Sequence, residues 1–211
     1  MRVKICGITT VADALAADLA GADAIGLIFF RGSKRYTELD TATSIAHAVS
    51  PYISINALFV DPTEAEVHRV LSQVPVSQIQ FHGSESAVFC SQFARPYVKC
   101  VPVSSSSTMQ KTMDEHQEAR AYLFDTAVAG DYGGTGQSFD WTKMPKKNVG
   151  YRVLAGGLNT ENVKKAIRIA QPDAVDVSSG VEAKPGIKDH DSVRRFVAAA
   201  KRAGEELLHD N

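Results

Sequence analysis

The sequence has little of several features that define whole classes of protein. It contains only three cysteines (Cys6, Cys90 and Cys100), an odd and irregularly spaced set that argues against a disulfide framework and indicates a reducing compartment. Its 23 Lys and Arg residues against 24 Asp and Glu leave a formal net charge of -1, which excludes an overall field that would attract nucleic acid or an anionic membrane. The longest apolar run, at residues 24–30, falls far short of the roughly 20 residues that span a bilayer. We therefore expect a cytoplasmic protein that is neither exported nor embedded in a membrane.

Metal-binding patterns are also missing. The six histidines show neither HxH nor HExxH spacing, so we expect no metal site. An anionic ligand would have to be bound by a local cluster of donors, because the chain as a whole carries almost no net charge.

Eight short stretches rich in β-branched and aromatic residues recur along the chain, and most of the gaps between them have the periodicity of amphipathic helices. Repeated strand and helix units predict a parallel sheet, and eight of them in a chain of 211 residues match a compact (β/α)8 TIM barrel. An open, doubly wound sheet is the alternative, because strand counts from one sequence are easily wrong by one or two. We expect residues 1–211 to form a single eight-stranded barrel domain. The predicted strands begin at Val3, Ala24, Ile55, Ser77, Tyr97, Ala121, Arg152 and Ala174.

The starts of several helices are marked in the sequence. Asp61, followed by a proline and a glutamate suited to a capping box, is a candidate N-cap, as are Asn159 and Asp189 for later helices. The segment between strands six and seven is instead rich in glycine, and we expect only a short helix there, near residues 140–144. A glycine-rich connection after a strand is a typical place for a loop that belongs to a functional site.

Side chains alternate along a barrel strand between the interior and the helix layer. In each strand we direct the more apolar of the two alternating sets of side chains toward the helices. The set that is left facing inward is unexpectedly polar. The polar members lie late in their strands, and active sites of such barrels sit at the carboxyl ends of the strands, so a thiol, a histidine and two carboxylates should converge there. The inward polar set is Lys4, Cys6, Gln78, Gln80, His82, Asp125 and Asp176.

These residues also have purely structural interpretations. A buried cysteine is usually a small hydrophobic residue, and Asp125 and Asp176 could cap the helices that follow them. His82 could hydrogen bond within the structure or to a substrate, and Asp176 to sugar hydroxyls or to a phosphate-binding loop. Cys90 and Cys100 are assigned to helix packing and to the barrel core.

Glycines follow the seventh and eighth predicted strands, as a pair after the seventh and singly after the eighth. Glycine lets the backbone approach a ligand closely, and the loops after these two strands form the recurrent phosphate site of such barrels. The backbone amides of Gly156, Gly157, Ser179 and Gly180 are therefore candidate phosphate donors. A third glycine cluster, which includes Gly134, could close over the same group.

Seven motifs, spread along nearly the whole length of the chain, resemble the phosphoribosylanthranilate isomerase family of tryptophan biosynthesis. KICGIT and GGTGQSFDW, in that order, are the most specific of them. The motifs are KICGIT (4–9), GADAIGLIFF through SKRY (21–36), QFHGSE (80–85), LFDT (123–126), GGTGQSFDW (133–141), AGGLNTENV (155–163) and DVSSGVE with PGIKD (176–189).

The resemblance implies an isomerase that catalyses the Amadori rearrangement of N-(5-phosphoribosyl)anthranilate to 1-(2-carboxyphenylamino)-1-deoxyribulose 5-phosphate. It implies that Cys6 is the general base, that Asp125 is the general acid and that Arg35 binds the anthranilate carboxylate; a solvated surface arginine is the structural alternative for Arg35. The family usually has proline where Lys34 stands and an arginine in the loop after strand five, where this chain has PVS at 102–104. These departures bear on loop conformation and substrate affinity more than on the chemistry.

The implied reaction needs no cofactor, because a Schiff base formed by the substrate itself acts as the electron sink. We expect a small phosphoribosyl molecule as the only binding partner, without nucleic acid or membrane, and a monomer as the simplest assembly. A free thiol and a free aspartic acid have pKa values of about 8.5 and 3.9, opposite to the charge states that the mechanism needs at pH 7. We hypothesise that Lys4, two residues from Cys6, favours the thiolate.

Three alternatives to this function follow from the same features. The aldose isomerase of histidine biosynthesis uses a carboxylate where this chain has Cys6, and pentose-phosphate epimerases need a metal set that the sequence lacks. A phosphometabolite-binding module without turnover is the non-enzymatic alternative. The presence of both Cys6 and Asp125 argues against such a module.

Overall fold

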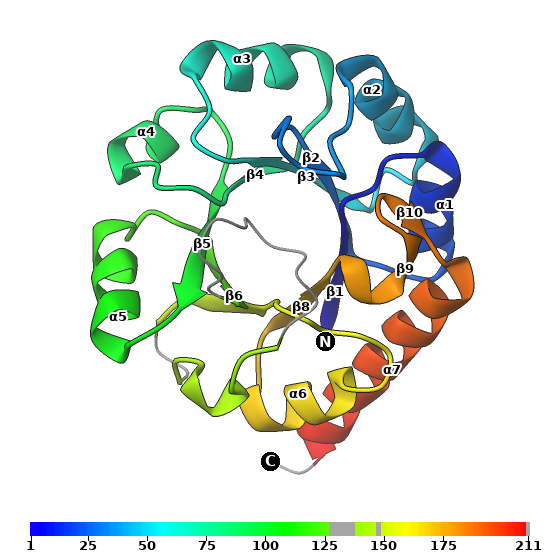
Figure 1. Ribbon diagram of the computed structural model, residues 1–211, viewed down its shortest axis with the longest axis vertical. Coiled ribbons are helices and arrows are strands. Elements are labelled where there is room, and N and C mark those ends of the chain that lie inside the picture. The colour runs from blue at the N-terminus through cyan, green and yellow to red at the C-terminus, as the bar shows by residue number, and fades with distance from the viewer. Residues whose placement is uncertain (127–137, 147–148, 210–211) are drawn as a thin grey trace.

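The computed structural model describes residues 1–126, 138–146 and 149–209, and these form a closed barrel of eight parallel strands with helices around it (Figure 1). Each strand pairs with its neighbour in sequence, and the last strand pairs with the first, so the alternative of an open sheet is wrong. The strands are β1 (Arg2–Cys6), β2 (Ala24–Ile28), β3 (Ser54–Phe59), β4 (Gln78–Phe81), β5 (Tyr97–Val103), β6 (Ala121–Thr126), β7 (Tyr151–Leu154) and β8 (Ala174–Val177).

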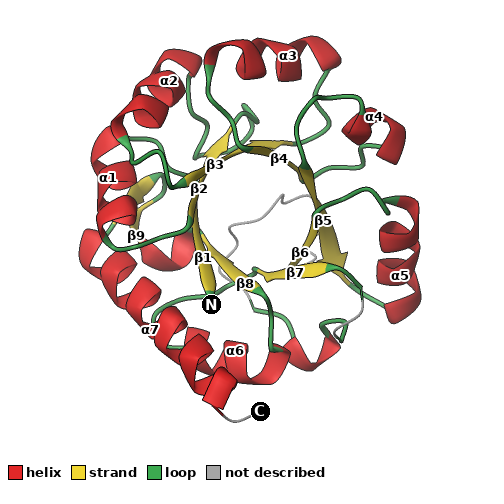
Figure 2. Cartoon of the chain, turned by 180° about the vertical axis from the view of Figure 1, so that it is seen from behind, coloured by secondary structure: helices red, strands yellow, loops and turns green. Residues whose placement is uncertain are grey.

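The helices form an outer layer that covers the barrel on all sides in the view from behind (Figure 2). A short antiparallel hairpin follows β8 and precedes the last helix. The helices are α1 (Val11–Leu19), α2 (Leu39–Ala48), α3 (Glu64–Gln73), α4 (Ala87–Ser91), α5 (Ser106–Glu115), α6 (Val163–Ala170) and α7 (His190–His209), the 3-10 turns are η1 (Trp141–Lys143) and η2 (Ser179–Val181), and the hairpin strands are β9 (Glu182–Lys184) and β10 (Ile187–Lys188).

The start of α3 differs from the prediction. Thr63 rather than Asp61 is the N-cap, because the Thr63 hydroxyl accepts from the Glu66 amide while the Glu66 carboxylate accepts from the Thr63 amide at 2.7 Å. Asp61 has a φ of 45°, whereas an N-cap residue has extended backbone. Its carboxylate instead accepts from the amide of Ser84 at 2.6 Å, which ties the loop after β3 to the loop after β4.

Of the other two predicted N-caps, Asp189 is confirmed and Asn159 is wrong. Asp189 accepts a hydrogen bond from the Ser192 amide at 2.6 Å directly before α7, so its capping role is confirmed. Asn159 lies further from its helix than expected, because α6 begins at Val163 after the N-cap Asn162. Its side-chain oxygen accepts from the Asn162 amide at 3.0 Å and organises the turn that leads into the helix. The short helix predicted near 140–144 is η1.

The interior of the barrel is divided into an apolar and a polar half. The apolar half comes mainly from β5, β6 and β7, and it includes Cys100 and Leu123, while Cys90 packs into the helix layer, as predicted for both cysteines. The polar half comes from β1, β3, β4 and β8 and contains Lys4, Asn56, Gln78, Gln80 and Asp176. The predicted alternation of side chains along the strands is therefore confirmed, and the polar side chains of the interior are gathered on one side.

No helix among the described residues is long and apolar enough to cross a membrane.

We propose that residues 1–211 form one domain, because pairing of β8 with β1 joins both ends of the chain in one ring. Unfolding should then be a single transition in which helical circular dichroism and the fluorescence of Trp141 change together. Leu123→Ala should lower the stability by about 2–5 kcal/mol and shift both signals equally, because Leu123 is 1% exposed in the barrel interior. Leu19→Ala, at a position that is 89% exposed, is the control. Separate midpoints for the two signals would contradict a single domain.

Candidate active site at the carboxyl end of the barrel

Most of the predicted inward polar residues meet in a small pocket of about 60 Å³ at the carboxyl ends of the strands, but Lys4 and Gln78 do not line it. Cys6, His82, Asp125 and Asp176 all line it, although they come from β1, the end of β4, β6 and β8. Arg35, from the loop after β2, lines the same pocket. Residues far apart in the sequence thus surround one space that is suited to a small polar ligand.

Cys6 is the last residue of β1 and is only 4% exposed. It packs against Ile28, Leu58 and Val60, so one wall of the site is apolar. Gly26 is its partner in the β1–β2 register, and a side chain there would place a Cβ 2.7 Å from the Cys6 sulfur. Glycine at position 26 therefore makes the room for the thiol.

Two buried lysines act on the thiol. Burial raises the pKa of Cys6 above its usual value, and Lys4 and Lys188 oppose this effect while Asp176 adds to it. Lys4 therefore lowers the pKa of Cys6, as hypothesised, but its effect is smaller than that of burial. Lys4 itself stays charged, because Asp176 and Cys6 raise its pKa against the lowering effect of burial.

Lys4 pairs with Asp176 across the register of β1 and β8, at 3.0 Å between Nζ and Oδ2. Asp176 therefore does not cap the turn that follows it, and the capping interpretation is wrong. Its other carboxylate oxygen is buried without a hydrogen-bond partner among the described residues, as is the hydroxyl of Ser178. Both residues line the pocket, and buried polar atoms of this kind indicate where a ligand would bind.

Arg35 is not a solvated surface arginine. Its Nε and Nη2 atoms donate to the two carboxylate oxygens of Glu182, each at 2.8 Å, and both side chains are largely buried. Gly7, at a φ of 72°, leaves space for this arrangement, because a Cβ on it would lie 2.6 Å from Cδ of Arg35. The guanidinium is thus held against the pocket wall in one orientation.

Glu182 and Lys188 were missed by the sequence analysis, although both lie inside the motif at residues 176–189. Lys188 Nζ donates to Glu182 at 2.9 Å and to the carbonyl of Ser178 at 3.1 Å, which ties the hairpin after β8 to the pocket. Burial by itself would raise the pKa of Glu182, but Arg35 and Lys188 hold it below its usual range. This cation–anion–cation cluster positions both cations beside Cys6.

Asp125 is the penultimate residue of β6, and its side chain lines the pocket. One carboxylate oxygen accepts from the Thr126 amide at 2.7 Å, and the other lies 3.5 Å from Nε2 of His82. Burial lowers the pKa of His82, while Cys100 and Asp125 raise it, and the net direction is upward. The acid predicted from the sequence is thus accompanied by a histidine from β4.

The loops after β7 and β8 meet beside these groups. Gly156 and Gly157 have φ values of 77° and 59°, and together with Ser179 they line the pocket. Gly180 does not line it; a Cβ on Gly180 would lie 1.8 Å from the carbonyl oxygen of Leu158, so this glycine lets the two loops touch. Gly134 lies outside the described residues.

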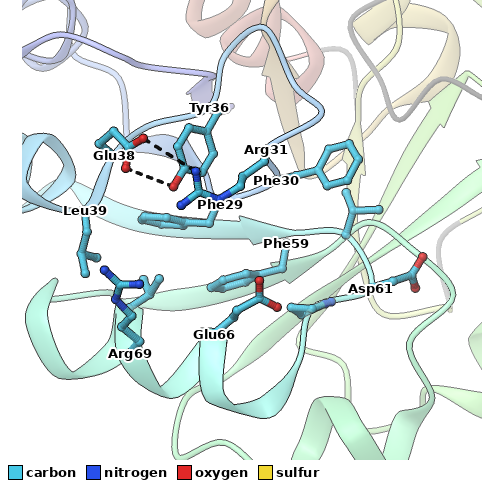
Figure 3. A pocket seen from close by; sticks show the side chains of 13 residues that line it. Phe29, Phe30, Arg31, Tyr36, Glu38, Leu39, Phe59, Asp61, Glu66 and Arg69 are labelled. Atoms are coloured by element: carbon cyan, nitrogen blue, oxygen red, sulfur yellow. Dashed lines mark hydrogen bonds and ion pairs between the residues drawn. The ribbon is translucent and has the colours of Figure 1, made fainter.

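A second, larger pocket of about 320 Å³ lies beside the active-site pocket, where the ends of β2 and β3 face α2 and α3 (Figure 3). Its floor is the stacked pair Phe29 and Phe59, with ring centroids 5.5 Å apart, and Arg31 lies over the Tyr36 ring at 5.0 Å. None of the predicted site residues lines this pocket.

Within the described residues there is no group of three or more His, Cys, Asp or Glu side chains that could hold a metal ion.

A closed parallel barrel that presents a thiol, a carboxylic acid and glycine-lined loops at its carboxyl end is typical of (β/α)8 enzymes that act on phosphorylated sugars. The comparison with known families agrees with this class. Residues 3–199 match the family model described as N-(5'phosphoribosyl)anthranilate (PRA) isomerase, and the chain belongs to this family.

Individual relatives are similar over nearly their whole length. An N-(5'-phosphoribosyl)anthranilate isomerase from Neisseria meningitidis serogroup C is 48% identical over 202 residues, which cover 96% of this chain and 97% of that protein. A solved phosphoribosyl anthranilate isomerase in complex with reduced 1-(o-carboxyphenylamino)-1-deoxyribulose 5-phosphate is 39% identical with a TM-score of 0.85, covering 96% of this chain and 99% of that one. A structure of monomers generated from the dimeric phosphoribosylanthranilate isomerase of Thermotoga maritima is 38% identical, with a TM-score of 0.85 and the same coverage of 96% and 99%.

Replacing Lys4 by methionine should raise the pKa of the Cys6 thiol, because the change removes a cation that favours the thiolate and leaves Asp176 uncompensated. The pH dependence of alkylation, followed on the Cys6 peptide by mass spectrometry, measures this shift. Lys99→Met is the matched control, since Lys99 is equally buried but pairs with Glu85, and it should leave the Cys6 pKa unchanged. An unchanged thiol pKa in Lys4→Met would rule out the tuning role.

Proposed function

We infer that the chain catalyses the Amadori rearrangement of N-(5-phosphoribosyl)anthranilate to 1-(2-carboxyphenylamino)-1-deoxyribulose 5-phosphate, a step of tryptophan biosynthesis. The observation that carries this inference is the shared pocket of Cys6 and Asp125, which gives one sugar access to both a base and an acid. Membership of the family and the similarity to an isomerase solved with the reduced product support it.

The first step opens the furanose ring. Asp125, in its protonated form, donates its proton to the ring oxygen while the anilino nitrogen lone pair forms the C1=N bond and the C1–O bond breaks. The products of this step are a cationic Schiff base and the Asp125 carboxylate. The Thr126 amide and His82, which contact the two carboxylate oxygens, stabilise the charge that develops there.

The second step removes the hydrogen from C2 of the sugar. The Schiff base withdraws electrons from the C2–H bond, so the Cys6 thiolate takes the proton and the bonding electrons form the C1=C2 bond of an enolamine. The enolamine becomes the ketone when C1 gains a proton and the C2 hydroxyl loses one. Cys6 then returns a proton to solvent and Asp125 gains one, so the cycle closes without a cofactor.

The substrate is anchored at both ends in this proposal. The amides of Gly156, Gly157 and Ser179 bind the phosphate, whose negative charge suits a cluster of backbone donors. Arg35 binds the anthranilate carboxylate, and the unpaired oxygen of Asp176 accepts from a sugar hydroxyl. Gly180 and Gly134 remain candidate contributors to the phosphate loops on the basis of the sequence alone.

Turnover of phosphoribosylanthranilate, followed by the loss of anthranilate-type fluorescence, tests the proposal. Cys6→Ser and Asp125→Asn should each lower kcat by about a hundredfold or more, because each removes one proton-transfer group. Arg35→Lys should raise KM more than twofold, because a lysine cannot form the planar two-pronged contact with Glu182 that fixes the orientation of the cation at the substrate carboxylate. A folded, unaltered protein without turnover would instead favour a phosphometabolite-binding module.

We further propose that the protein works as a cytoplasmic monomer. The three cysteines are buried and free of disulfides, as a reducing compartment requires. Among the described residues, the most exposed large apolar side chains are Leu19, Tyr52, Val88 and Leu208, which come from four different segments of the chain. Light scattering in reducing buffer should give the mass of one chain; the mass of two would place this protein with its dimeric relative from Thermotoga maritima.

A further inference from the structure

A chain of polar contacts crosses the barrel interior from β1 to β6. Lys4 Nζ lies 3.0 Å from Oε1 of Gln80, Gln80 Nε2 lies 3.1 Å from Nδ1 of His82, and His82 Nε2 lies 3.5 Å from Oδ2 of Asp125. Gln80 is 1% exposed, and the side chains of Lys4, His82 and Asp125 are 8%, 9% and 12% exposed. Water is therefore most fully excluded at the Gln80 amide.

The direction of each contact follows from the chemistry of the groups. An ammonium has donors only, so Lys4 requires the oxygen of the Gln80 amide to face it. The amide nitrogen of Gln80, which is also a donor only, then faces Nδ1 of His82. Nδ1 must accept, so the ring proton lies on Nε2, the nitrogen that faces Asp125.

We propose that Gln80 is a positioning residue that holds His82 as the Nε2–H tautomer, so that His82 donates to the carboxyl group of Asp125. This inference rests on the proposed role of Asp125 as the general acid. Gln80 acts through His82. Because Lys4 can only donate, it fixes the orientation of the Gln80 amide, and that amide in turn fixes which nitrogen of His82 carries the proton.

The groups around His82 favour opposite charge states of the ring. Asp125 on β6 and Cys100 on β5 favour a second ring proton, while burial disfavours it. Lys4 on β1 is a further cation in the chain, and its partner Asp176 on β8 neutralises it. A second proton on His82 would sit on Nδ1, directly against the donating amide of Gln80, and a flipped amide would meet the Lys4 ammonium with the same conflict. On balance these charges raise the pKa of His82, whereas the donating amide of Gln80 opposes a second ring proton and favours the neutral ring.

A neutral donor suits the proposed acid. A cation beside a carboxyl group favours the carboxylate, whereas the proposed acid must carry a proton. A neutral Nε2–H contact instead strengthens as negative charge develops on Asp125 during proton transfer. The effect of Gln80 should therefore appear in kcat rather than in KM.

Histidine ¹⁵N spectra of the folded protein test the tautomer directly, with the His82 signals identified by their loss in His82→Asn. At pH 7 we expect one protonated and one unprotonated ring nitrogen, with the proton on Nε2. Gln80→Glu replaces the amide donor by an acceptor, so Nδ1 should gain a proton and His82 should become an imidazolium, and kcat should fall about tenfold or more while KM stays within about twofold.

Gln78→Glu is the matched control. Gln78 lies on the same strand with the same inward direction, but it donates to Asn56 at 3.0 Å and contacts neither Lys4 nor His82. This variant should leave the His82 signals and kcat unchanged. If Gln80→Glu does not fold, Gln80→Met removes the donor without adding charge, and His82 should then show a mixture of both tautomers.

An Nδ1–H tautomer or an imidazolium in the unaltered protein at pH 7 would overturn the proposal, and so would His82 signals that do not move in the folded Gln80 variant. Failure of the proposed function has a different signature. In that case the Nε2–H tautomer and its dependence on Gln80 would be present, but the unaltered protein would not turn over phosphoribosylanthranilate.

Discussion

The buried ion pair of Lys4 and Asp176 is the contact on which the rest of the active site depends. The register that closes the barrel between β1 and β8 brings these two residues together, so closure of the ring and neutralisation of the charge occur together. Removing one partner of such a pair typically costs about 3–5 kcal/mol, because the other is left as an uncompensated buried charge. The same ammonium influences the Cys6 thiol and orients the amide of Gln80.

The two proposed catalytic groups sit in different surroundings for a physical reason. Cys6 lies against apolar side chains, where a thiolate is unfavourable, and its ionisation depends on the nearby cations Lys4 and Lys188. Asp125 has hydrogen-bond donors at both oxygens and no lysine or arginine paired with it among the described residues. Lysines thus lie on the side of the base, and the Thr126 amide and His82 on the side of the acid.

Much of the site could be predicted from local pattern, because alternation along a strand and the common end of parallel strands place Cys6, His82, Asp125 and Asp176 together. The contacts of Arg35 with Glu182 could not be predicted in this way, since they depend on how a hairpin after β8 folds over a loop after β2. The role of Gly26 required the strand register, which the sequence does not encode locally. The N-cap of α3 was assigned two residues early because both candidate positions have a glutamate three residues later, and only backbone conformation separates them.

The Arg35–Glu182 contact joins residues that are 147 positions apart, one from the first half of the barrel and one from the second. The residues that line the pocket are divided between the same two halves. The first four strands carry the thiol and the histidine, and the last four carry the carboxylic acid and the glycine loops. A half-barrel made of either set would therefore hold only part of the proton-transfer machinery, and its arginine would be separated from the carboxylate that orients it. Any ancestor assembled from two such halves would have gained this chemistry only at the moment of their fusion or association.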